Sequence, residues 1–242
     1  MCSLSSKPAH PLTSSLANAG QSAGATVASN ALPLIIKNIY SNPRVLAKVR
    51  EEIADVPRGS MVTIEDTTAR VVNGQCRYPY LEATVLEGLR LAPMFGLSLS
   101  RKVPSIGCRL NEFYIPPGYV VSMSAWSSNI NKGYFGEDAR EFRPERWLGN
   151  HPTELAKDGS GLPRTMRNYM EAGWFTFGAG ARVCLGRHMT ELAFAKFIAS
   201  FVREFDIEIV KGGYVLYGLV QRYEEMVVAA KVRDENVTAI KA

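Results

Sequence analysis

Cys184 stands at the end of a glycine-rich stretch and directly before a long amphipathic pattern. A thiol at the start of a helix meets unpaired backbone N–H groups and the positive end of the helix dipole, which favour the thiolate that binds metal. Gly178, Gly180 and Gly186 lack a Cβ, so the backbone around the cysteine could lie flat against a large planar ligand. Arg182 adds a positive fork suited to a carboxylate. We interpret Cys184 as a metal ligand; the alternative is a cysteine that packs as a small hydrophobic residue.

A second polar pattern occurs earlier in the chain. Glu87 and Arg90 stand three residues apart on a segment whose apolar residues repeat at helical spacing from Tyr78 to Pro93. Taken alone, such a pair is usually a solvated salt bridge worth less than about 1 kcal/mol. The run Phe142-Arg143-Pro144-Glu145-Arg146-Trp147 follows it. Whether Glu87 and Arg90 form an exposed salt bridge or a structural pair therefore depends on the other motifs of the chain.

The stretch from Phe177 to Gly186 reads Phe-Gly-x-Gly-x-Arg-x-Cys-x-Gly. It resembles the haem-binding loop of the haem-thiolate monooxygenases, the cytochrome P-450 family. The resemblance implies haem b (iron protoporphyrin) as the cofactor, with Cys184 as the axial ligand of the haem iron. It also implies that Arg182 pairs with a haem propionate, and that Phe177 and Gly178 lie beside the cofactor. Arg101 would be a second propionate contact.

The same resemblance extends to the earlier motifs. The run ending in Trp147 looks like the family's second signature, and Arg146 is the position that completes a buried structural cluster with Glu87 and Arg90. The three must pair, because a buried charge without its partner is costly. One departure is Ser128-Asn129-Ile130-Asn131, where relatives often have His-Arg-Asp, and the sequence assigns it no role.

Residues 16–40 would correspond to the family's long central helix. An alignment without gaps places Ala23-Gly24 on the motif Ala-Gly-x-(Asp/Glu)-Thr-(Thr/Ser), so that Thr26 takes the acid position and Val27 the threonine position. Starting the motif at Ala19-Gly20 instead requires a four-residue insertion. Either way the acid and alcohol pair that relays protons to bound dioxygen in the family is missing, and Thr26 is the candidate catalytic residue that remains.

In the family, the segment before the hairpin passes over the haem. The resemblance therefore implies that Phe95 and Leu97 line a substrate pocket, and that the tip near Tyr217 reaches it. The alternative is that Phe95 and Leu97 are ordinary core residues. A flavoprotein reductase that uses NADPH would dock on the cysteine side, where the basic residues are Arg182, Arg187 and Lys196.

The residue patterns predict a mainly α fold with small β-sheets. The family resemblance implies that this is the C-terminal portion of the cytochrome P-450 fold. Residues 1–15 would be a disordered leader, and residues 16–242 a truncated haem-thiolate domain. The expected helices are 16–40, interrupted or kinked at Pro33, 43–53, 78–93, and one after Gly186 with a core stripe of Met189, Leu192, Ala193, Phe197 and Phe201. Residues 150–170 would be a polar surface insertion.

Short strands are expected in two regions. Pro116-Pro117-Gly118 has turn chemistry and would join two strands. Gly212-Gly213 would turn the chain between two more. The predicted strands are 109–115, 119–123, 205–210, 214–220 and 226–232.

Composition sets broad limits on partners and location. The chain has 242 residues, of which 46% are hydrophobic and 21% charged, and a net charge of +5 spread along its length. We therefore expect neither a nucleic-acid partner nor a transmembrane segment. The sequence leaves the location unknown; the two options that fit the family resemblance are the cytosol and a peripheral position at the cytosolic face of the endoplasmic reticulum. The absence of Cys-x-x-Cys pairs argues against zinc or a disulfide scaffold; the cysteines are at 2, 76, 108 and 184.

Three functions remain open at this stage. The first is a monooxygenase that oxidises a hydrophobic small molecule, and the style of the motifs resembles fungal enzymes of secondary metabolism. The second is a haem-thiolate isomerase or dehydratase that does not use dioxygen, which fits Val27 in the threonine position. The third is a truncated, non-catalytic remnant or interaction protein, because the motifs correspond only to the second half of a full-length relative.

Overall fold

The computed structural model describes residue 24 and residues 30–57, 77–95, 97–148, 173–216 and 222–233. The helices are α2 (Leu32–Tyr40), α3 (Pro43–Glu52), α5 (Pro79–Leu91), α6 (Ala125–Asn129), α7 (Lys132–Phe135) and α9 (Arg187–Glu204), with 3-10 turns η2 (Pro144–Trp147) and η3 (Gly180–Arg182). The strands are β1 (Leu99–Lys102), β2 (Cys108–Leu110), β3 (Phe113–Ile115), β4 (Val120–Met123), β5 (Phe205–Leu216) and β6 (Arg222–Val232). The expected leader and surface insertion lie outside the described residues.

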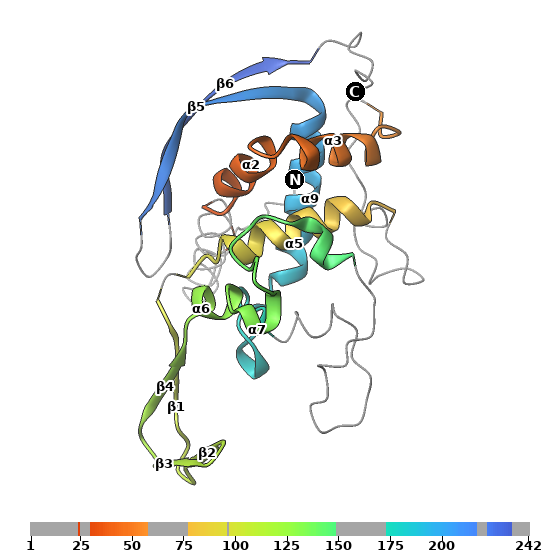
Figure 1. Ribbon diagram of the computed structural model, residues 1–242. Coiled ribbons are helices and arrows are strands. Elements are labelled where there is room, and N and C mark those ends of the chain that lie inside the picture. The colour runs from red at the N-terminus through yellow and green to blue at the C-terminus, as the bar shows by residue number, and fades with distance from the viewer. Residues whose placement is uncertain are drawn as a thin grey trace, which may run out of the picture.

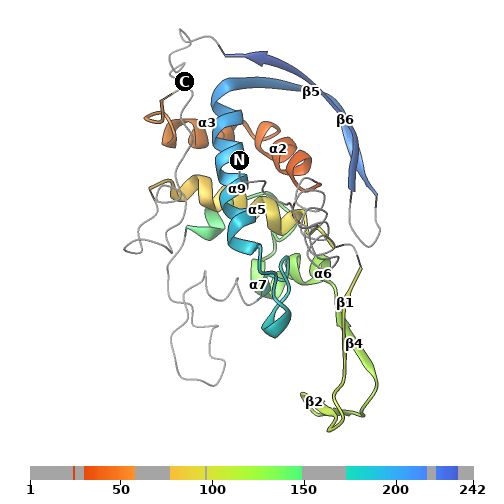
Figure 2. The same ribbon diagram turned by 180° about the vertical axis from the view of Figure 1, so that it is seen from behind.

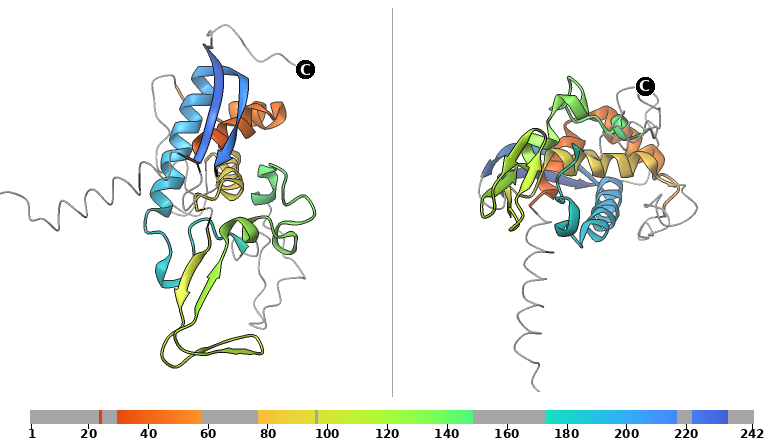
Figure 3. Two further views of the ribbon diagram at one scale, coloured as in Figure 1. Left: turned by 90° about the vertical axis from the view of Figure 1, so that its left-hand side faces the viewer. Right: turned by 90° about the horizontal axis from the view of Figure 1, so that it is seen from below.

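The described chain combines helices with small antiparallel sheets. The strands pair as β1 with β4, β2 with β3 and β5 with β6, each pair antiparallel. Helices α2, α3, α5 and α9 gather into one body, the β5–β6 hairpin curves along one side of it, and the β1–β4 hairpin projects from the far end (Figure 1). Turned to the side, the projecting hairpin is seen to stand clear of the helices (Figure 3).

Helix α5 runs through the middle of the helical body. Nearly all of its side chains are buried, from Tyr80 to Arg90 with the exception of Glu82. A helix that is buried all round has other elements on every side, and Figure 2 shows α9 crossing it. On another side α2 approaches so closely that a Cβ on Gly88 would lie 2.7 Å from the side chain of Ile35. Glycine at this position therefore allows the contact between α2 and α5.

The N-terminus of α5 is capped from α3. The Glu52 carboxylate accepts hydrogen bonds from the backbone N–H groups of Tyr80 and Leu81, both at 2.7 Å. The first N–H groups of a helix have no partner inside the helix, and a negative charge there also meets the positive end of the helix dipole. This contact fixes α3 against the start of α5.

Of the helix predicted over residues 16–40, the structure describes residue 24 and the part from residue 30, where a turn at Asn30 and Ala31 precedes α2. Helix α2 begins at Leu32, so Pro33 lies in its first turn. The missing N–H of proline costs nothing there, because the first N–H groups of a helix are unpaired in any case. The prediction for the next helix agrees with the structure: α3 begins at Pro43, with Val45 and Val49 buried.

The helix expected after Gly186 is present as α9, and Phe201 of its predicted core stripe packs half-buried against the core, but three other residues of the stripe are exposed. Met189 is 76% exposed, Phe197 is 43% exposed, and Ala193 is also exposed. The buried face is made instead by Phe194, Ala195, Ile198, Ala199 and Val202. Apolar residues recur on two sides of this helix, so periodicity alone does not identify the side that packs on α5.

The predicted strands 109–115 and 119–123 do not form one hairpin. Asn111, whose φ of 54° is left-handed, turns the chain between β2 and β3, so that the first run is itself a hairpin. Asparagine tolerates this conformation better than most residues. Residues 116–118 then lead into β4, which pairs with β1, opposite Leu99 to Lys102. The polar turn inside the first run lacks glycine, and the strand prediction therefore missed it.

Residues 205–216 form one long strand, so the predicted turn at Gly212-Gly213 is also wrong. Strand β5 pairs with β6 on both sides of these glycines, with a register shift between Ile209 and Lys211. Gly213 has a φ of +64°, and a Cβ there would lie 2.6 Å from the carbonyl oxygen of Glu224. The glycine thus serves a close approach between paired strands. Lys37 of α2 donates to the carbonyl of Gly212 at 2.9 Å and holds the hairpin to the helices.

Across the described residues, none of the helices has the length and the apolar character needed to cross a lipid bilayer.

Candidate functional site

The cysteine loop, residues 174–186, lies before the N-terminus of α9. Its backbone is closed by three hydrogen bonds: Gly178 N–H to Phe175 O at 3.0 Å, Val183 N–H to Gly180 O at 3.1 Å, and Cys184 N–H to Phe177 O at 2.9 Å. Gly178 and Gly180 have φ values of 70° and 67°. These left-handed conformations favour glycine, which explains why the loop needs glycine at these two positions.

Cys184 is exposed and forms no disulfide with the other described cysteine, Cys108. Helix α9 begins at Arg187, and the N–H of Arg187 donates to the carbonyl of Cys184 at 3.4 Å. The thiol therefore lies just before an 18-residue helix, next to the positive end of the helix dipole. The described residues contain no group of three or more His, Cys, Asp or Glu that could share a metal ion.

The back of the loop is held by aromatic packing. Phe177 and Trp174 are both 6% exposed, and their rings meet edge to face with centroids 5.5 Å apart. Trp147 meets Trp174 in the same manner at 5.5 Å. On the other side, the Arg187 guanidinium lies 4.8 Å from the Trp174 ring centroid. Phe177, whose carbonyl accepts the bond from Cys184, is thereby fixed in the core.

Two exposed arginines lie on the elements around the cysteine. Arg182 is in the loop itself, and Arg101 is on β1 and donates to the carbonyl of Ser100 at 2.8 Å. Strand β1 lies against the loop, because a Cβ on Gly178 would be 3.5 Å from Leu99 Cδ1. Neither guanidinium has an ion-pair partner among the described residues. Within the part of the chain that the structure describes, no carboxylate occupies either guanidinium.

Glu87, Arg90 and Arg146 are in direct contact and buried, and we name them the Glu87 cluster. Arg90 binds Glu87 through both Nε and Nη2 at 2.8 Å, and Arg146 Nε binds the same carboxylate at 2.8 Å. Trp147 Nε1 at 2.8 Å and the N–H of Arg143 at 2.9 Å complete its partners. Glu87 and Arg90 are 0% exposed and Arg146 is 6% exposed. Pairing of this quality offsets the cost of taking these charges out of water.

The Glu87 cluster also orders the surrounding backbone. Arg90 Nη1 donates to the carbonyls of Asn129 at 2.7 Å and Ala139 at 2.5 Å. Arg146 Nη1 donates to the carbonyl of Phe135 at 2.7 Å. The remaining guanidinium N–H groups thus hold the irregular segment around α6 and α7 against α5.

Sequence reasoning missed Asn129 and Thr176, both buried. The Asn129 amide nitrogen donates to Arg90 O at 2.9 Å and to Thr176 Oγ1 at 2.7 Å, and its oxygen accepts from the N–H of Phe175 at 2.8 Å. Thr176 Oγ1 donates in turn to Leu89 O at 3.1 Å. The available signal was the departure at residues 128–131, because a polar residue at a buried position requires partners elsewhere.

Glu145 is a third residue to which the sequence assigned no role of its own. Arg44 of α3 forms a bidentate pair with it, and Lys48 and Tyr80 donate to it at 3.1 and 2.9 Å. Burial works against ionisation of this carboxyl, but the bonds from Arg44, its own backbone, Lys48 and Tyr80 outweigh burial and lower the pKa of Glu145 to about 2. The residue thus joins α3, α5 and η2 through a charged contact.

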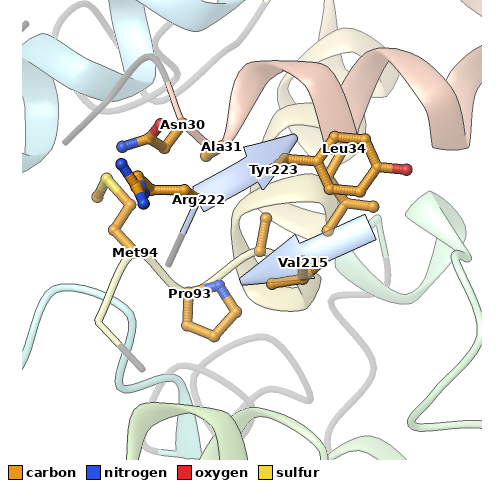
Figure 4. A pocket seen from close by; sticks show the side chains of 9 residues that line it. Asn30, Ala31, Leu34, Pro93, Met94, Val215, Arg222 and Tyr223 are labelled. Carbon is orange, nitrogen blue, oxygen red and sulfur yellow. The ribbon is translucent and has the colours of Figure 1, made fainter. Parts of the chain in front are cut away.

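A small pocket opens where the starts of α2, β6 and the segment after α5 meet (Figure 4). Its volume of about 10 Å³ suits roughly one water molecule. The lining residues are Asn30, Ala31, Leu34, Ala92, Pro93, Met94, Val215, Arg222 and Tyr223. Of the residues predicted to line a substrate pocket, Phe95 packs half-buried against the core and Leu97 is 58% exposed, and neither lines this one. Tyr217 and Thr26 lie outside the described residues.

The site is thus an exposed cysteine at a helix N-terminus, on a glycine-shaped loop, backed by aromatic rings. The family model for Cytochrome P-450 matches residues 16–217. This chain therefore belongs to the cytochrome P-450 family, which confirms the resemblance drawn from the motifs. Members of this family carry a haem cofactor.

Several fungal proteins are similar to this chain. Pisatin demethylase from Fusarium vanettenii is 36% identical over 190 residues, a match covering 78% of this chain and 33% of the relative. A cytochrome P-450 monooxygenase of Emericella nidulans, pkfB, is 36% identical over 188 residues, with coverage of 78% and 33%. Another from Sarocladium schorii, asR2, is 31% identical over 187 residues, with coverage of 77% and 34%. The chain matches about a third of the length of these curated relatives.

Proposed function

We propose that this chain is the C-terminal portion of a haem-thiolate monooxygenase, and that it binds haem b with Cys184 as the protein ligand of the iron. The observation that carries the proposal is the exposed Cys184 at the N-terminus of α9, in a loop that matches the family motif in full. When bound, a haem with a thiolate ligand supplies the electron density at iron that favours O–O cleavage.

The residues around Cys184 fit a planar, anionic cofactor. Gly180 has nothing within 4 Å of the position where a Cβ would stand, so the described residues leave open space at this point of the loop. Arg182 and Arg101 offer guanidinium groups without ion-pair partners among the described residues, and a guanidinium pairs well with a carboxylate such as a haem propionate. In this proposal Cys184 binds the iron, the two arginines bind propionates, and Gly178 and Phe177 lie beside the cofactor.

The proposed substrate is a hydrophobic small molecule of fungal secondary metabolism. One relative acts on pisatin, as its name states, and several others are named monooxygenases of fungi. The pocket of Figure 4 is lined in part by Met94, from the same stretch as Phe95 and Leu97, and by residues that flank 217–221. We propose that this corner is one wall of the substrate site, with Phe95, Leu97 and Tyr217 contributing to the rest of it.

Electrons would come from an NADPH-dependent flavoprotein reductase. Of the three basic residues predicted for this docking surface, Arg182 is exposed and Lys196 is half-buried, whereas Arg187 is half-buried, pairs with Glu191 at 2.9 Å and contributes less positive charge. A positive surface accelerates association with an acidic partner and makes the rate depend on salt. The expected signature is a rate of electron transfer that falls as the ionic strength rises.

A second candidate, a haem-thiolate isomerase or dehydratase, is favoured by one observation. The sequence has Thr26-Val27 where the family motif has an acid and an alcohol for proton relay. Such an enzyme would turn over a preformed peroxide without reductant, whereas the monooxygenase requires NADPH.

The test is consumption of dioxygen by the haem-loaded chain with NADPH, a fungal reductase and a panel of hydrophobic compounds. Substrate-dependent consumption with a hydroxylated or demethylated product supports the monooxygenase. Turnover of an organic peroxide alone, with no reductant-dependent consumption, would replace it with the isomerase. A well-folded chain that shows neither activity would contradict both and leave a non-catalytic protein.

A further inference from the structure

We propose that Asn129 is a positioning residue for the cysteine loop. Its side chain fixes residues 175–177, and the backbone carbonyl of Phe177 in this segment binds the N–H of Cys184. The position of the loop is a property of the polypeptide alone, whereas its effect on haem ligation rests on the proposed function. The contacts that carry the inference run from the C-terminus of α5, through Asn129 and Thr176, to the backbone of Cys184.

The chain of contacts begins at orphan carbonyls. Helix α5 ends at Leu91, so the carbonyls of Leu89 and Arg90 in its last turn have no partner within the helix. Thr176 Oγ1 donates to the first at 3.1 Å, and the Asn129 amide donates to the second at 2.9 Å. The end of the central helix is thus capped by a residue of the cysteine loop and by the last residue of α6.

Asn129 binds the loop twice. Its amide nitrogen donates to Thr176 Oγ1 at 2.7 Å, and its oxygen accepts the backbone N–H of Phe175 at 2.8 Å. The next residue, Phe177, supplies the carbonyl that accepts the N–H of Cys184 at 2.9 Å. Thr176, which Asn129 binds, is therefore the direct neighbour in sequence of Phe177, which binds the N–H of Cys184.

The amide group suits this place in a way that other side chains do not. A carboxamide has two N–H donors and one oxygen acceptor, and all three functions are used here. An aspartate would keep the acceptor but lose both donors. A neutral histidine would keep one donor and one acceptor. Since Asn129 is 0% exposed and Thr176 is 2% exposed, any contact that is lost leaves a buried polar group without a partner.

Asn129 also connects the loop with the Glu87 cluster. Arg90 Nη1 donates to the backbone carbonyl of Asn129 at 2.7 Å, while the backbone carbonyl of Arg90 accepts from the Asn129 side chain. The two residues therefore hold each other in both directions. The Glu87 cluster contains no residue of the cysteine loop, but through these two bonds it contributes to the position of the cysteine.

The experiment compares three variants of the full chain, each with and without haem. Asn129→Asp removes both donors at the same size, Thr176→Val removes the hydroxyl at the same shape, and Ser128→Ala is the matched control. Ser128 Oγ donates to the carbonyl of Gly173 at 2.6 Å, so the control also loses one bond between α6 and the segment before the loop. Should Asn129→Asp fail to fold, Thr176→Val decides.

The first measurement is amide hydrogen exchange on the chain without haem. We expect exchange of the Cys184 amide to accelerate about tenfold in Asn129→Asp and Thr176→Val, with little change at the Ile39 amide in α2. Ser128→Ala should leave the Cys184 amide at the wild-type rate. Equal acceleration at both amides would indicate general destabilisation and would overturn the proposal, as would an unchanged rate at Cys184.

The second measurement is the reduced carbon-monoxide difference spectrum after loading with haem. Asn129→Asp and Thr176→Val should lose part of the thiolate band in favour of the shorter-wavelength band of haem without a thiolate ligand. Ser128→Ala should keep the wild-type ratio of the two bands. An unchanged ratio of the two bands in Asn129→Asp and Thr176→Val would refute a positioning role of Asn129 in haem ligation. A wild-type chain with no thiolate band would refute the proposed function instead, and the exchange measurement would still decide the role of Asn129.

Discussion

The indole Nε1 of Trp147 donates a hydrogen bond of 2.8 Å to Oε2 of Glu87, and both side chains are fully buried. The same tryptophan ring packs edge to face on Trp174, the first residue of the cysteine loop. Trp147 therefore joins the Glu87 cluster to the aromatic rings that pack behind the cysteine loop. A change at Glu87 removes one end of this connection.

Glu87→Gln is expected to lower the free energy of unfolding by about 3–5 kcal/mol, because Arg90 remains buried without its carboxylate and Arg146 keeps only the longer contact with Asp138 at 3.3 Å. This is a large part of the stability of an ordinary domain, so much of the protein should be insoluble. Chemical denaturation of the soluble fraction measures the loss. Glu137→Gln is the matched control, since Glu137 is 88% exposed, and it should change stability by less than about 0.5 kcal/mol. An undisturbed unfolding curve for Glu87→Gln would contradict the role of the cluster.

Glu145 is expected to make stability depend on pH in the acid range. Its pKa is lowered from 4.5 to about 2 in the folded chain, so the unfolded state binds a proton first as the pH falls. The stabilisation from this residue is complete above pH 4.5 and is lost as the pH drops toward about 2. Denaturation of the wild type and of Glu145→Gln should therefore give curves that differ most near neutral pH and converge in acid. A constant difference down to pH 2 would mean that Glu145 has an ordinary pKa.

Gly180→Ala is expected to destabilise the chain by about 1–2 kcal/mol through the backbone alone. Gly180 has a φ of +67° and nothing within 4 Å of a Cβ, so no steric overlap contributes. Gly180→Asn should cost less, because asparagine tolerates the left-handed region. Gly186→Ala is the control, with a φ of −82° and no contact closer than 3.8 Å. Denaturation midpoints in the order wild type, Asn, Ala would agree with this account, and equal midpoints would show that the loop adopts another backbone conformation.

Arg182→Leu is expected to weaken retention of haem while the axial ligand stays the same. The guanidinium of Arg182 has no ion-pair partner among the described residues, and in the proposed site it binds a propionate. Transfer of haem to an apo-globin acceptor should be faster from this variant than from the wild type, with the thiolate spectrum retained until transfer. Arg109→Leu, a change of an exposed arginine on β2, should leave the transfer rate unaltered. Equal rates for all three proteins would remove Arg182 from the site.

The sequence predicted the family, the helices α3, α5 and α9 and the loop that bears Cys184, because each has a local signal. Pro43 marks the start of one helix, and the glycine pattern marks the loop. The errors arose where the answer depends on distant residues. The buried face of α9 depends on the elements that pack against it, and the continuation of β5 through Gly212-Gly213 without a turn depends on its pairing with β6.

Asn129 and Glu145 illustrate the same limit at the level of side chains. Nothing next to Asn129 in the sequence reveals that its partners are Arg90, Phe175 and Thr176. Glu145 forms its strongest pairs with α3, about one hundred residues earlier. Motifs predict residues whose role is local, whereas buried polar networks become visible only when the chain is folded.

The most direct test of the central claim is the reduced carbon-monoxide difference spectrum of the haem-loaded chain, measured for the wild type and for Cys184→Ala. The wild type should give the red-shifted band of a thiolate-bound haem, and Cys184→Ala should lose that band entirely while circular dichroism shows that it remains folded. A thiolate band that survives in Cys184→Ala, or that is absent from well-folded wild-type protein, would contradict Cys184 as the ligand of the haem iron.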